Sequence, residues 1–330
     1  MHGDGVFKER LERIGVPVHS LSSHRWLPSY VPRLIGHIAS ARFDVVHCHL
    51  LGANLIAKPL AALLRTPVRI NHDHCNDKAT LSAPMRTADR WLNGLSNHII
   101  AVSESTRAGL LATGVAPERV TTIHNGLDLA SYCPRPEERI AARQKLGIPA
   151  DAFIVGGIGR LTFLKNFAFF VKVAEEVCAK TPNAHFVIAG TGPDESALRA
   201  QIAASGMNDR IRLLGFVADP AGLYPALDVL LLTSRFEGLP MTILEAMACG
   251  IGIVASDLDG MREILENGTH ASLVKSDDAA AFAACVKELV AQPELLRVRV
   301  EAALRLVRER FSAEAMTRSV EAIYDRCLRS

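Results

Sequence analysis

The sequence predicts an α/β fold built from two doubly wound parallel sheets, each covered by helices. Short runs rich in β-branched residues alternate with stretches of helical spacing along most of the chain, as in parallel sheets wrapped by helices. The length of 330 residues is typical of about two domains. Periodicity is lost at residues 129–137, where Pro134 and Pro136 indicate a linker between the domains.

In the first half of the chain we expect strands and helices in strict alternation. Each expected strand is a short apolar run, and each expected helix has apolar residues three to four positions apart. The strands are residues 16–21, 44–48, 68–71, 98–102 and 120–124. The helices between them are residues 29–41, 52–65, 85–95 and 105–112.

The second half repeats this alternation and ends in helices. Its expected strands are residues 152–158, 185–189, 210–214, 229–233, 252–256 and 272–274. From residue 277 the pattern is helical to the end, with breaks at Pro293 and Phe311. The chain therefore divides into a first domain (1–132), a second domain (133–310) and a C-terminal helix (311–330) that is free to cross back to the first.

Composition and charge exclude several classes of protein. The 37 basic and 35 acidic residues give a net charge of +2, without the strong basic field that nucleic-acid binding requires. No apolar run is long enough to span a membrane, the first residues do not resemble a signal peptide, and the seven cysteines indicate reduced thiols. We expect a cytoplasmic protein, with peripheral contact to the inner face of the membrane left open by Arg10, Arg13, Arg25, Arg33 and Arg42.

The segment 235–250 carries the strongest functional signal. Pro240 suits the first position of a helix, Gly238 provides the turn into it, and Gly250 provides the stop. The first turn of a helix leaves backbone N–H groups unpaired at the positive end of the helix dipole, which favours a bound phosphate. Here those groups belong to Met241, Thr242 and Ile243.

Two carboxylates flank this helix start. Glu245 lies five residues beyond Pro240, which is roughly 7 to 8 Å further along the axis and comparable to the reach from a diphosphate to a ribose. A carboxylate accepts hydrogen bonds from two neighbouring hydroxyls, and Glu237 lies on the other side of the phosphate position. The pair predicts a clamp for a nucleotide and a sugar, although an ordinary amphipathic helix would carry the same spacing.

Glycine-rich turns follow two expected strands of the second half. Gly156-Gly-Ile-Gly159-Arg160 lacks the third glycine of a dinucleotide fingerprint, because Thr162 stands there. Arg160 and Lys165 could instead bring two cations to one diphosphate, or they are ordinary surface charges. Gly190-Thr-Gly192-Pro193 is a second tight turn that lets the backbone approach a ligand.

Histidines gather at the ends of two strands of the first half. His47 and His49 end one strand, and His72 and His74, followed by Cys75, end another. A metal site is conceivable, but neither a His-x-x-x-His nor a Cys-x-x-Cys spacing supports it. We therefore favour a polar acceptor pocket, with satisfied core histidines as the alternative, and assign no metal.

Together these residues resemble the retaining nucleotide-sugar glycosyltransferases of family four. That family has the GT-B fold, in which two Rossmann-like domains face a cleft. The resemblance covers about residues 44 to 330 and rests on an ordered set of motifs. These are Ala101-Val-Ser-Glu104, Asn125-Gly-Leu-Asp128, Gly159-Arg160, Lys165-Asn166, Gly190-Thr-Gly192-Pro193, Leu214-Gly-Phe216, Glu237 with Glu245, and Asp259-Gly-Met-Arg-Glu263.

The resemblance implies roles for the residues of the donor site and for two histidines. Arg160 and Lys165 would hold the diphosphate, Glu245 the ribose hydroxyls, and Glu237 the hydroxyls of the transferred sugar. Phe216 would edge the base pocket, and His72, with His74 as a second candidate, would face the sugar from the first domain. The remaining donor contacts would be Gly159, Gly192, Gly238, Met241, Thr242 and Ile243.

The activity that the resemblance implies is hexose transfer with retention of configuration. The donor would be a UDP- or GDP-linked sugar and the acceptor a hydroxyl of a glycan or lipid-linked molecule, as in polysaccharide biosynthesis. The leaving diphosphate would take the acceptor's proton, so neither a cofactor nor a metal is expected. The first domain should be incomplete, because a βα unit of roughly 30 residues that opens such chains is missing before Met1. A nucleotide-sugar-binding protein without turnover, or a sugar-nucleotide epimerase, are the alternatives.

Overall fold

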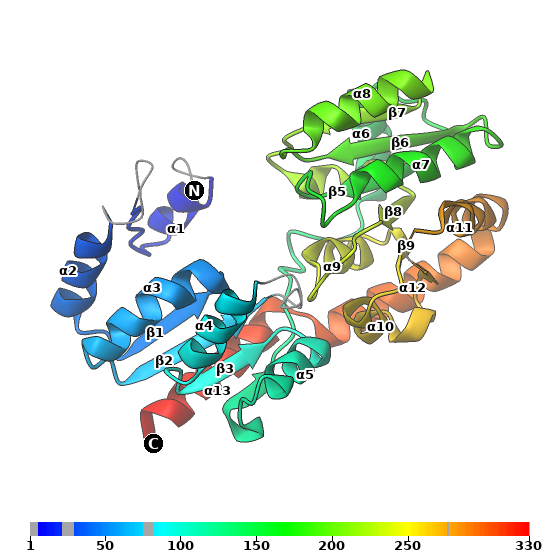
Figure 1. Ribbon diagram of the computed structural model, residues 1–330. Coiled ribbons are helices and arrows are strands. Elements are labelled where there is room, and N and C mark those ends of the chain that lie inside the picture. Colours follow the sequence, from blue (N-terminus) through cyan, green and yellow to red (C-terminus); the bar gives the residue numbers. More distant parts are fainter. Residues whose placement is uncertain (1–5, 22–29, 75–81, 276, 330) are drawn as a thin grey trace.

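The structure is a computed structural model that describes residues 6–21, 30–74, 82–275 and 277–329. Two parallel sheets lie in separate lobes, which are joined by a linker and by the long C-terminal helices (Figure 1). The predicted α/β class with two parallel sheets is therefore confirmed.

The first sheet has the strand order β1-β2-β3-β4, and all neighbours run parallel. Parallel neighbours require crossover connections, and helices provide them here. The strands are β1 (Val45–His49), β2 (Val68–Asp73), β3 (His98–Ala101) and β4 (Val120–Thr122). The helices of this part are α1 (Val6–Arg13), α2 (Val31–Ala41), α3 (Leu50–Leu63), α4 (Ala83–Asn93) and α5 (Glu104–Ala112).

The strand predicted at residues 16–21 is absent, and this prediction was wrong. The segment joins α1 to α2 without strand pairing, and its His19 ring lies 4.3 Å from the His37 ring of α2. Strand composition is not sufficient, because a strand needs a neighbouring strand to satisfy its backbone groups. The helix predicted at 29–41 is α2, although residue 29 lies outside the described residues.

The second sheet has the strand order β10-β9-β8-β5-β6-β7. Its strands are β5 (Phe153–Ile158), β6 (Ala184–Ala189), β7 (Ile211–Gly215), β8 (Val229–Leu232), β9 (Gly252–Ser256) and β10 (Ser272–Val274). Its helices are α6 (Arg139–Leu146), α7 (Phe167–Cys178), α8 (Glu195–Ser205), α9 (Met241–Ala248), α10 (Asp259–Ile264), α11 (Ala279–Ala291) and α12 (Pro293–Arg310). The chain runs outward from β5 on one side and from β8 on the other. In such sheets the crevice between the two diverging strands is where ligands bind.

The last helix, α13 (Ala313–Arg329), packs against the first sheet (Figure 1). Its Ile323 is buried in one cluster with Val68, Ile70 and Ile100. The chain thus passes between the domains twice, and the two passages are hydrogen bonded. Leu127 N–H donates to Phe311 O (2.8 Å), and Ala313 N–H donates to Leu127 O (2.9 Å).

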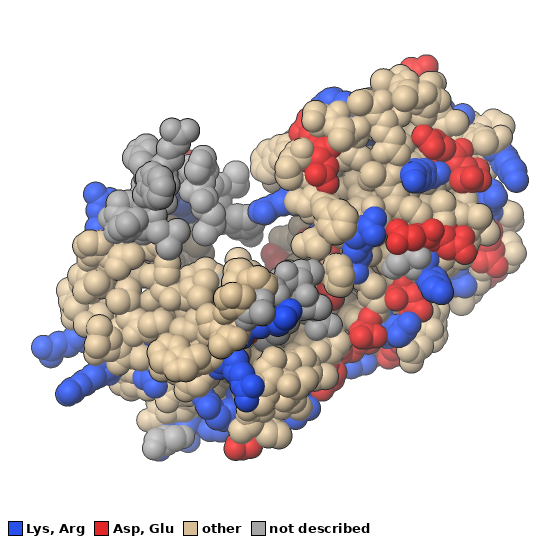
Figure 2. Space-filling model, in the orientation of Figure 1, with Lys and Arg blue, Asp and Glu red and all other residues tan. Residues whose placement is uncertain are grey.

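The surface differs between the two lobes. On the face drawn in Figure 2, Lys and Arg side chains predominate on the first domain, whereas both signs mix on the second. Arg13, Arg33 and Arg42 are exposed, while Arg25 lies outside the described residues. Within the described ranges, no helix combines the length and the apolarity that crossing a bilayer requires.

Candidate functional site

Two glycine turns meet at the carboxyl ends of β5 and β6. Gly159 has φ +156° and Gly190 has φ +148°, conformations that other residues rarely adopt. A Cβ at Gly190 would lie 1.8 Å from the carbonyl oxygen of Gly159, and one at Gly192 would lie 2.2 Å from that of Leu161. Glycine is therefore required for this close contact of the two turns.

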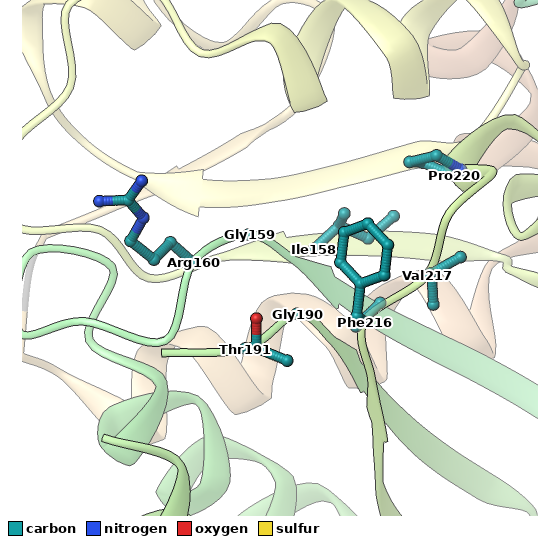
Figure 3. A pocket seen from close by; sticks show the side chains of 9 residues that line it. Ile158, Gly159, Arg160, Gly190, Thr191, Phe216, Val217 and Pro220 are labelled. Atoms are coloured by element: carbon teal, nitrogen blue, oxygen red, sulfur yellow. The ribbon is translucent and has the colours of Figure 1, made fainter. Parts of the chain in front are cut away.

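These turns form one side of an elongated pocket with a volume of about 250 Å³. In Figure 3, Arg160 lies at one end and Phe216 with Pro220 toward the other, with Thr191 between them. Phe216 is 71% exposed, which is unusual for so large an apolar residue. The pocket offers a flat apolar surface at one end and a guanidinium at the other.

Lys165 and Glu237 meet in an ion pair at the point where β5 and β8 diverge. Lys165 Nζ donates to Glu237 Oε1, and Ser234 Oγ–H donates to the same oxygen at 2.6 Å. Lys165 precedes α7 and Glu237 follows β8, so the sheet brings the two charges together. The sequence analysis missed Ser234, because a serine after a strand gives no spacing signal.

Glu245 is held by two tyrosines. Tyr224 Oη–H donates to Glu245 Oε2 at 2.7 Å, and the Tyr132 hydroxyl also lies near this carboxylate. Burial raises the pKa of Glu245, although both hydroxyls act to lower it. Burial and the neighbouring Glu245 also raise the pKa of both tyrosines, which therefore stay protonated as donors. Sequence reasoning missed both, since Tyr132 lies in the linker and Tyr224 in a short turn before β8.

Helix α9 begins one residue later than predicted. Pro240 is its N-cap, with φ −73° and ψ 125°, rather than its first helical residue. Ile243 N–H donates to Pro240 O at 3.2 Å, so this amide already has a partner. The Thr242 hydroxyl is buried without a hydrogen-bond partner among the described residues. Met241 and Thr242 are therefore the amides best suited to an anion.

The second domain contacts the first at this point. A Cβ at Gly238 would lie 2.6 Å from the carbonyl oxygen of His74, which follows β2. Asn125 Nδ2 donates to Leu239 O at 3.0 Å. The loop that carries Glu237 thus lies directly against the segment that follows His72.

His47, His49, His72 and His74 form a stack of rings at the ends of β1 and β2. Ring centroids are 4.3 Å apart for His47 and His49 and also for His72 and His74. Burial lowers the pKa of His72 to about 2 and those of His47 and His74 to about 4, so the rings are neutral at pH 7. Cys75 lies outside the described residues.

A second contact between the domains involves Glu263 of α10. Both of its carboxylate oxygens accept from the backbone N–H of Glu104 at the start of α5, at 2.9 and 3.0 Å. His124 Nε2 lies 2.5 Å from Glu263 Oε1. Burial would raise the pKa of Glu263, but the bonds to His124 and to the backbone of Glu104 and Ser105 lower it.

Two contacting parallel-sheet domains, with a pocket at the glycine turns of the second domain that includes Arg160, are characteristic of GT-B proteins. The profile described as "Glycosyl transferases group 1" matches residues 138–305, and "Glycosyltransferase Family 4" matches residues 1–131. This chain belongs to the group 1 glycosyltransferases of family four.

Relatives and solved structures agree with this assignment. A 2-deoxystreptamine N-acetyl-D-glucosaminyltransferase of Streptomyces fradiae is 30% identical over 96% of this chain and 83% of its own length. A lipopolysaccharide core biosynthesis mannosyltransferase, LpcC of Rhizobium leguminosarum bv. viciae, is 32% identical over 72% of this chain and 67% of its own. The crystal structure of Anabaena HepE in complex with UDP and glucose superposes with a TM-score of 0.87 at 22% identity, covering 98% of this chain and 90% of that one. The GT-B fold is confirmed.

The structure brings together most of the residues singled out from the sequence. Gly159, Arg160 and Phe216 line one pocket, and Gly192 supports its wall. Lys165 contacts Glu237, and Gly238 contacts the segment after His72. Glu245 is the fifth residue of α9, where its carboxylate is directed to Tyr224.

Proposed function

We propose that this glycosyltransferase moves a hexose from a nucleoside diphosphate sugar to a hydroxyl of a glycan or lipid-linked acceptor, with retention of configuration. The observation that carries the proposal is the arrangement of Arg160, Lys165 and Glu237 around the crevice next to the pocket at Phe216. A flat apolar surface suits a base, and the two cations suit a diphosphate.

The nucleotide half of the donor would use the remaining residues. The ribose hydroxyls would bind the Glu245 carboxylate, and a phosphate would meet the amides of Met241 and Thr242 at the start of α9. The related HepE is described in complex with UDP-glucose. We therefore place UDP-linked donors ahead of GDP-linked ones.

In the reaction itself, the bond between the anomeric carbon and the phosphate oxygen breaks while the acceptor oxygen bonds to that carbon on the same face. The acceptor's proton goes to the leaving diphosphate, so the step requires neither a nucleophilic side chain nor a metal or cofactor. Arg160 and Lys165 would stabilise the negative charge that develops on the diphosphate. Glu237 and His72 would hold the sugar from opposite sides of the crevice.

Lys165 has a second task in this scheme. Its ion pair with Glu237 joins the residue that binds the phosphate to the residue that binds the sugar. A bound donor would thus be oriented by a connected pair of charges. Closure of the crevice would exclude water, which is the competing acceptor.

The proposal is tested by supplying UDP- and GDP-linked hexoses with candidate glycan and lipid-linked acceptors. We expect release of the nucleoside diphosphate and an α-linked product from an α-linked donor, as judged by NMR. Lys165→Ala should reduce turnover by about 100-fold or more, in the range for loss of a charged transition-state contact, and Glu245→Ala should reduce turnover by weakening donor binding. Lys172→Ala, at an exposed position of α7, is the matched control.

Other outcomes distinguish the alternatives. Nucleotide binding by calorimetry without any turnover would favour a binding protein. An altered sugar nucleotide formed without an acceptor would identify an epimerase. For the cellular site, we propose the cytoplasm, with peripheral contact at the inner face of the membrane if the acceptor is lipid-linked.

A further inference from the structure

The histidines at the ends of β1 and β2 have the chemistry of a metal-binding site. One ring nitrogen each of His47, His49 and His72 lies within 4.8 Å of the other two. His49 and His72 are register partners on neighbouring parallel strands, and His47 precedes His49 by two residues. The period of the strand therefore puts all three on the same face.

The unpaired ring nitrogens point to a ligand. Both nitrogens of His72, which is only 4% exposed, and Nε2 of His47 are buried without a hydrogen-bond partner among the described residues. Burying an unpaired imidazole costs free energy. A neutral ring has one N–H donor and one lone-pair acceptor, and water would have satisfied both. Three such atoms close together indicate that something else completes the site.

The paired nitrogens support the same conclusion. His47 Nδ1 lies 2.6 Å from Tyr324 Oη, and His49 Nδ1 lies 2.8 Å from His74 Nε2. Metal-binding histidines usually donate one ring N–H to such a partner, which fixes the tautomer and presents the other nitrogen to the ion. In His47 and His49 this arrangement presents Nε2.

We propose that His47, His49 and His72 bind a divalent transition metal ion, with Zn²⁺ as the best fit. Zn–N bonds of about 2.0–2.1 Å imply nitrogen separations of roughly 3.4 Å in a tetrahedral site, so nitrogens that now lie within 4.8 Å of one another must approach by up to about 1.4 Å. His49 is the exposed member of the three, so the movement falls mainly on its ring. The fourth position is open to water, to His74 or to a substrate oxygen. Three nitrogen ligands select zinc, copper or nickel over magnesium and calcium.

The test is a titration of the chelator-treated full chain with Zn²⁺, in competition with a chromogenic chelator. We expect one ion per chain, and Co²⁺ in its place should give the d–d absorption of a low-symmetry nitrogen site. His49→Gln and His72→Gln should each weaken Zn²⁺ binding by about tenfold or more. Excess Mg²⁺ should not displace the ion.

His185→Gln is the matched control. His185 Nδ1 is also buried without a hydrogen-bond partner, but His185 is not part of the cluster. This variant should keep the wild-type stoichiometry and affinity, while circular dichroism verifies that every variant is folded. Equal Zn²⁺ affinity in wild type and His49→Gln, or an equal loss in His185→Gln, would overturn the proposal.

The metal would also affect the reaction proposed above. An ion on His72 removes the ring that faces the transferred sugar, so Zn²⁺ should inhibit transfer and EDTA should restore it. This second readout rests on the proposed function, whereas the titration does not. Binding without inhibition would therefore leave the metal site standing and count against the role of His72.

Discussion

Single hydrogen bonds determine how Glu245 is presented to a ligand. Tyr224 and Tyr132 orient its carboxylate from two different parts of the chain, and burial makes the charged form costly. A carboxylate fixed in this way meets a ribose diol without first losing side-chain freedom. In the proposed function, the tyrosines would therefore act as positioning residues for the nucleotide.

We predict that Tyr224→Phe weakens UDP binding by about tenfold, because a hydrogen bond to a charged group contributes about 1.5–3 kcal/mol. Isothermal titration calorimetry with UDP measures the change. Tyr30→Phe, in the turn before α2, serves as the control. Unchanged affinity in Tyr224→Phe would show that this hydroxyl does not orient the carboxylate.

The raised pKa of Glu245 predicts a pH dependence. In the proposed site, the ionised carboxylate accepts hydrogen bonds from two ribose hydroxyls, whereas the protonated acid is a poor acceptor. Nucleotide affinity should therefore fall on acidification. Because burial raises this pKa above the ordinary value of 4.5, the fall should begin at a higher pH than for an exposed glutamate. UDP affinity measured from pH 8 down to pH 5, in wild type and in Glu245→Gln, tests this expectation. The variant should lose the pH dependence.

The sequence revealed some residues of the site and not others. Their arrangement along the chain explains the difference. Arg160 with Lys165, and Glu237 with Glu245, lie within one loop or one turn-and-helix, so local spacing revealed each pair. Tyr132 and Tyr224 contribute only through tertiary contacts with Glu245, and no spacing in a single sequence encodes such contacts. Ser234 lies only three residues before Glu237, but a serine in a loop has no distinctive pattern.

At the scale of elements, the turns after β5 and β6 build the pocket wall. Their backbones touch because glycine stands at both positions. The alternation of strands and helices was predictable because buried parallel strands such as β8 are continuous apolar runs. Residues 16–21 resemble a strand in composition but lie beside α2, outside the hydrogen-bonded sheet. Whether such a segment becomes a strand depends on a neighbouring strand that can pair with it, and composition carries no information about that neighbour.

Backbone strain alone costs about 1–3 kcal/mol. Gly190→Ala should destabilise the second domain by more than this, because the added Cβ also clashes with the backbone of Gly159. Gly206→Ala separates the two effects. Gly206 also has positive φ, +70°, but nothing lies within 4 Å of an added Cβ. Gly206→Ala should therefore lower the free energy of unfolding by only about 1 kcal/mol. Urea denaturation of both variants measures the difference, and equal losses would mean that the contact with Gly159 is unimportant.

On the scale of the whole molecule, contacts between the domains set the width of the crevice. Glu263 bonds to the start of α5 and to His124, and Asn125 bonds to Leu239. Asn125 and Glu263 belong to motifs that the sequence contains but to which no role was assigned from the sequence. The motifs around Asn125 and Glu263 are therefore explained by domain contact rather than by contact with the donor.

We predict that Glu263→Gln loosens the domain arrangement. The lowered pKa of Glu263 means that its carboxylate stabilises the fold above the ordinary value of 4.5, and that this contribution is lost as pH falls through the lowered value. Acid titration of stability should therefore be flatter in Glu263→Gln than in wild type. Small-angle scattering at pH 7 should show a larger radius of gyration. Glu288→Gln, on α11, is the control, and identical scattering in Glu263→Gln would contradict the prediction.

The return of α13 to the first sheet has a consequence for synthesis on the ribosome. Among the described residues, Val68, Ile70, Ile100 and Ile123 form one buried cluster on a face of that sheet, and residues of α13 cover it. At translation rates of about 5–20 residues per second, this face waits roughly 10 to 40 s for its cover after Ile123 has been made. The first domain thus precedes the second in the chain but is finished after it, and its nascent apolar surface is a natural substrate for chaperones.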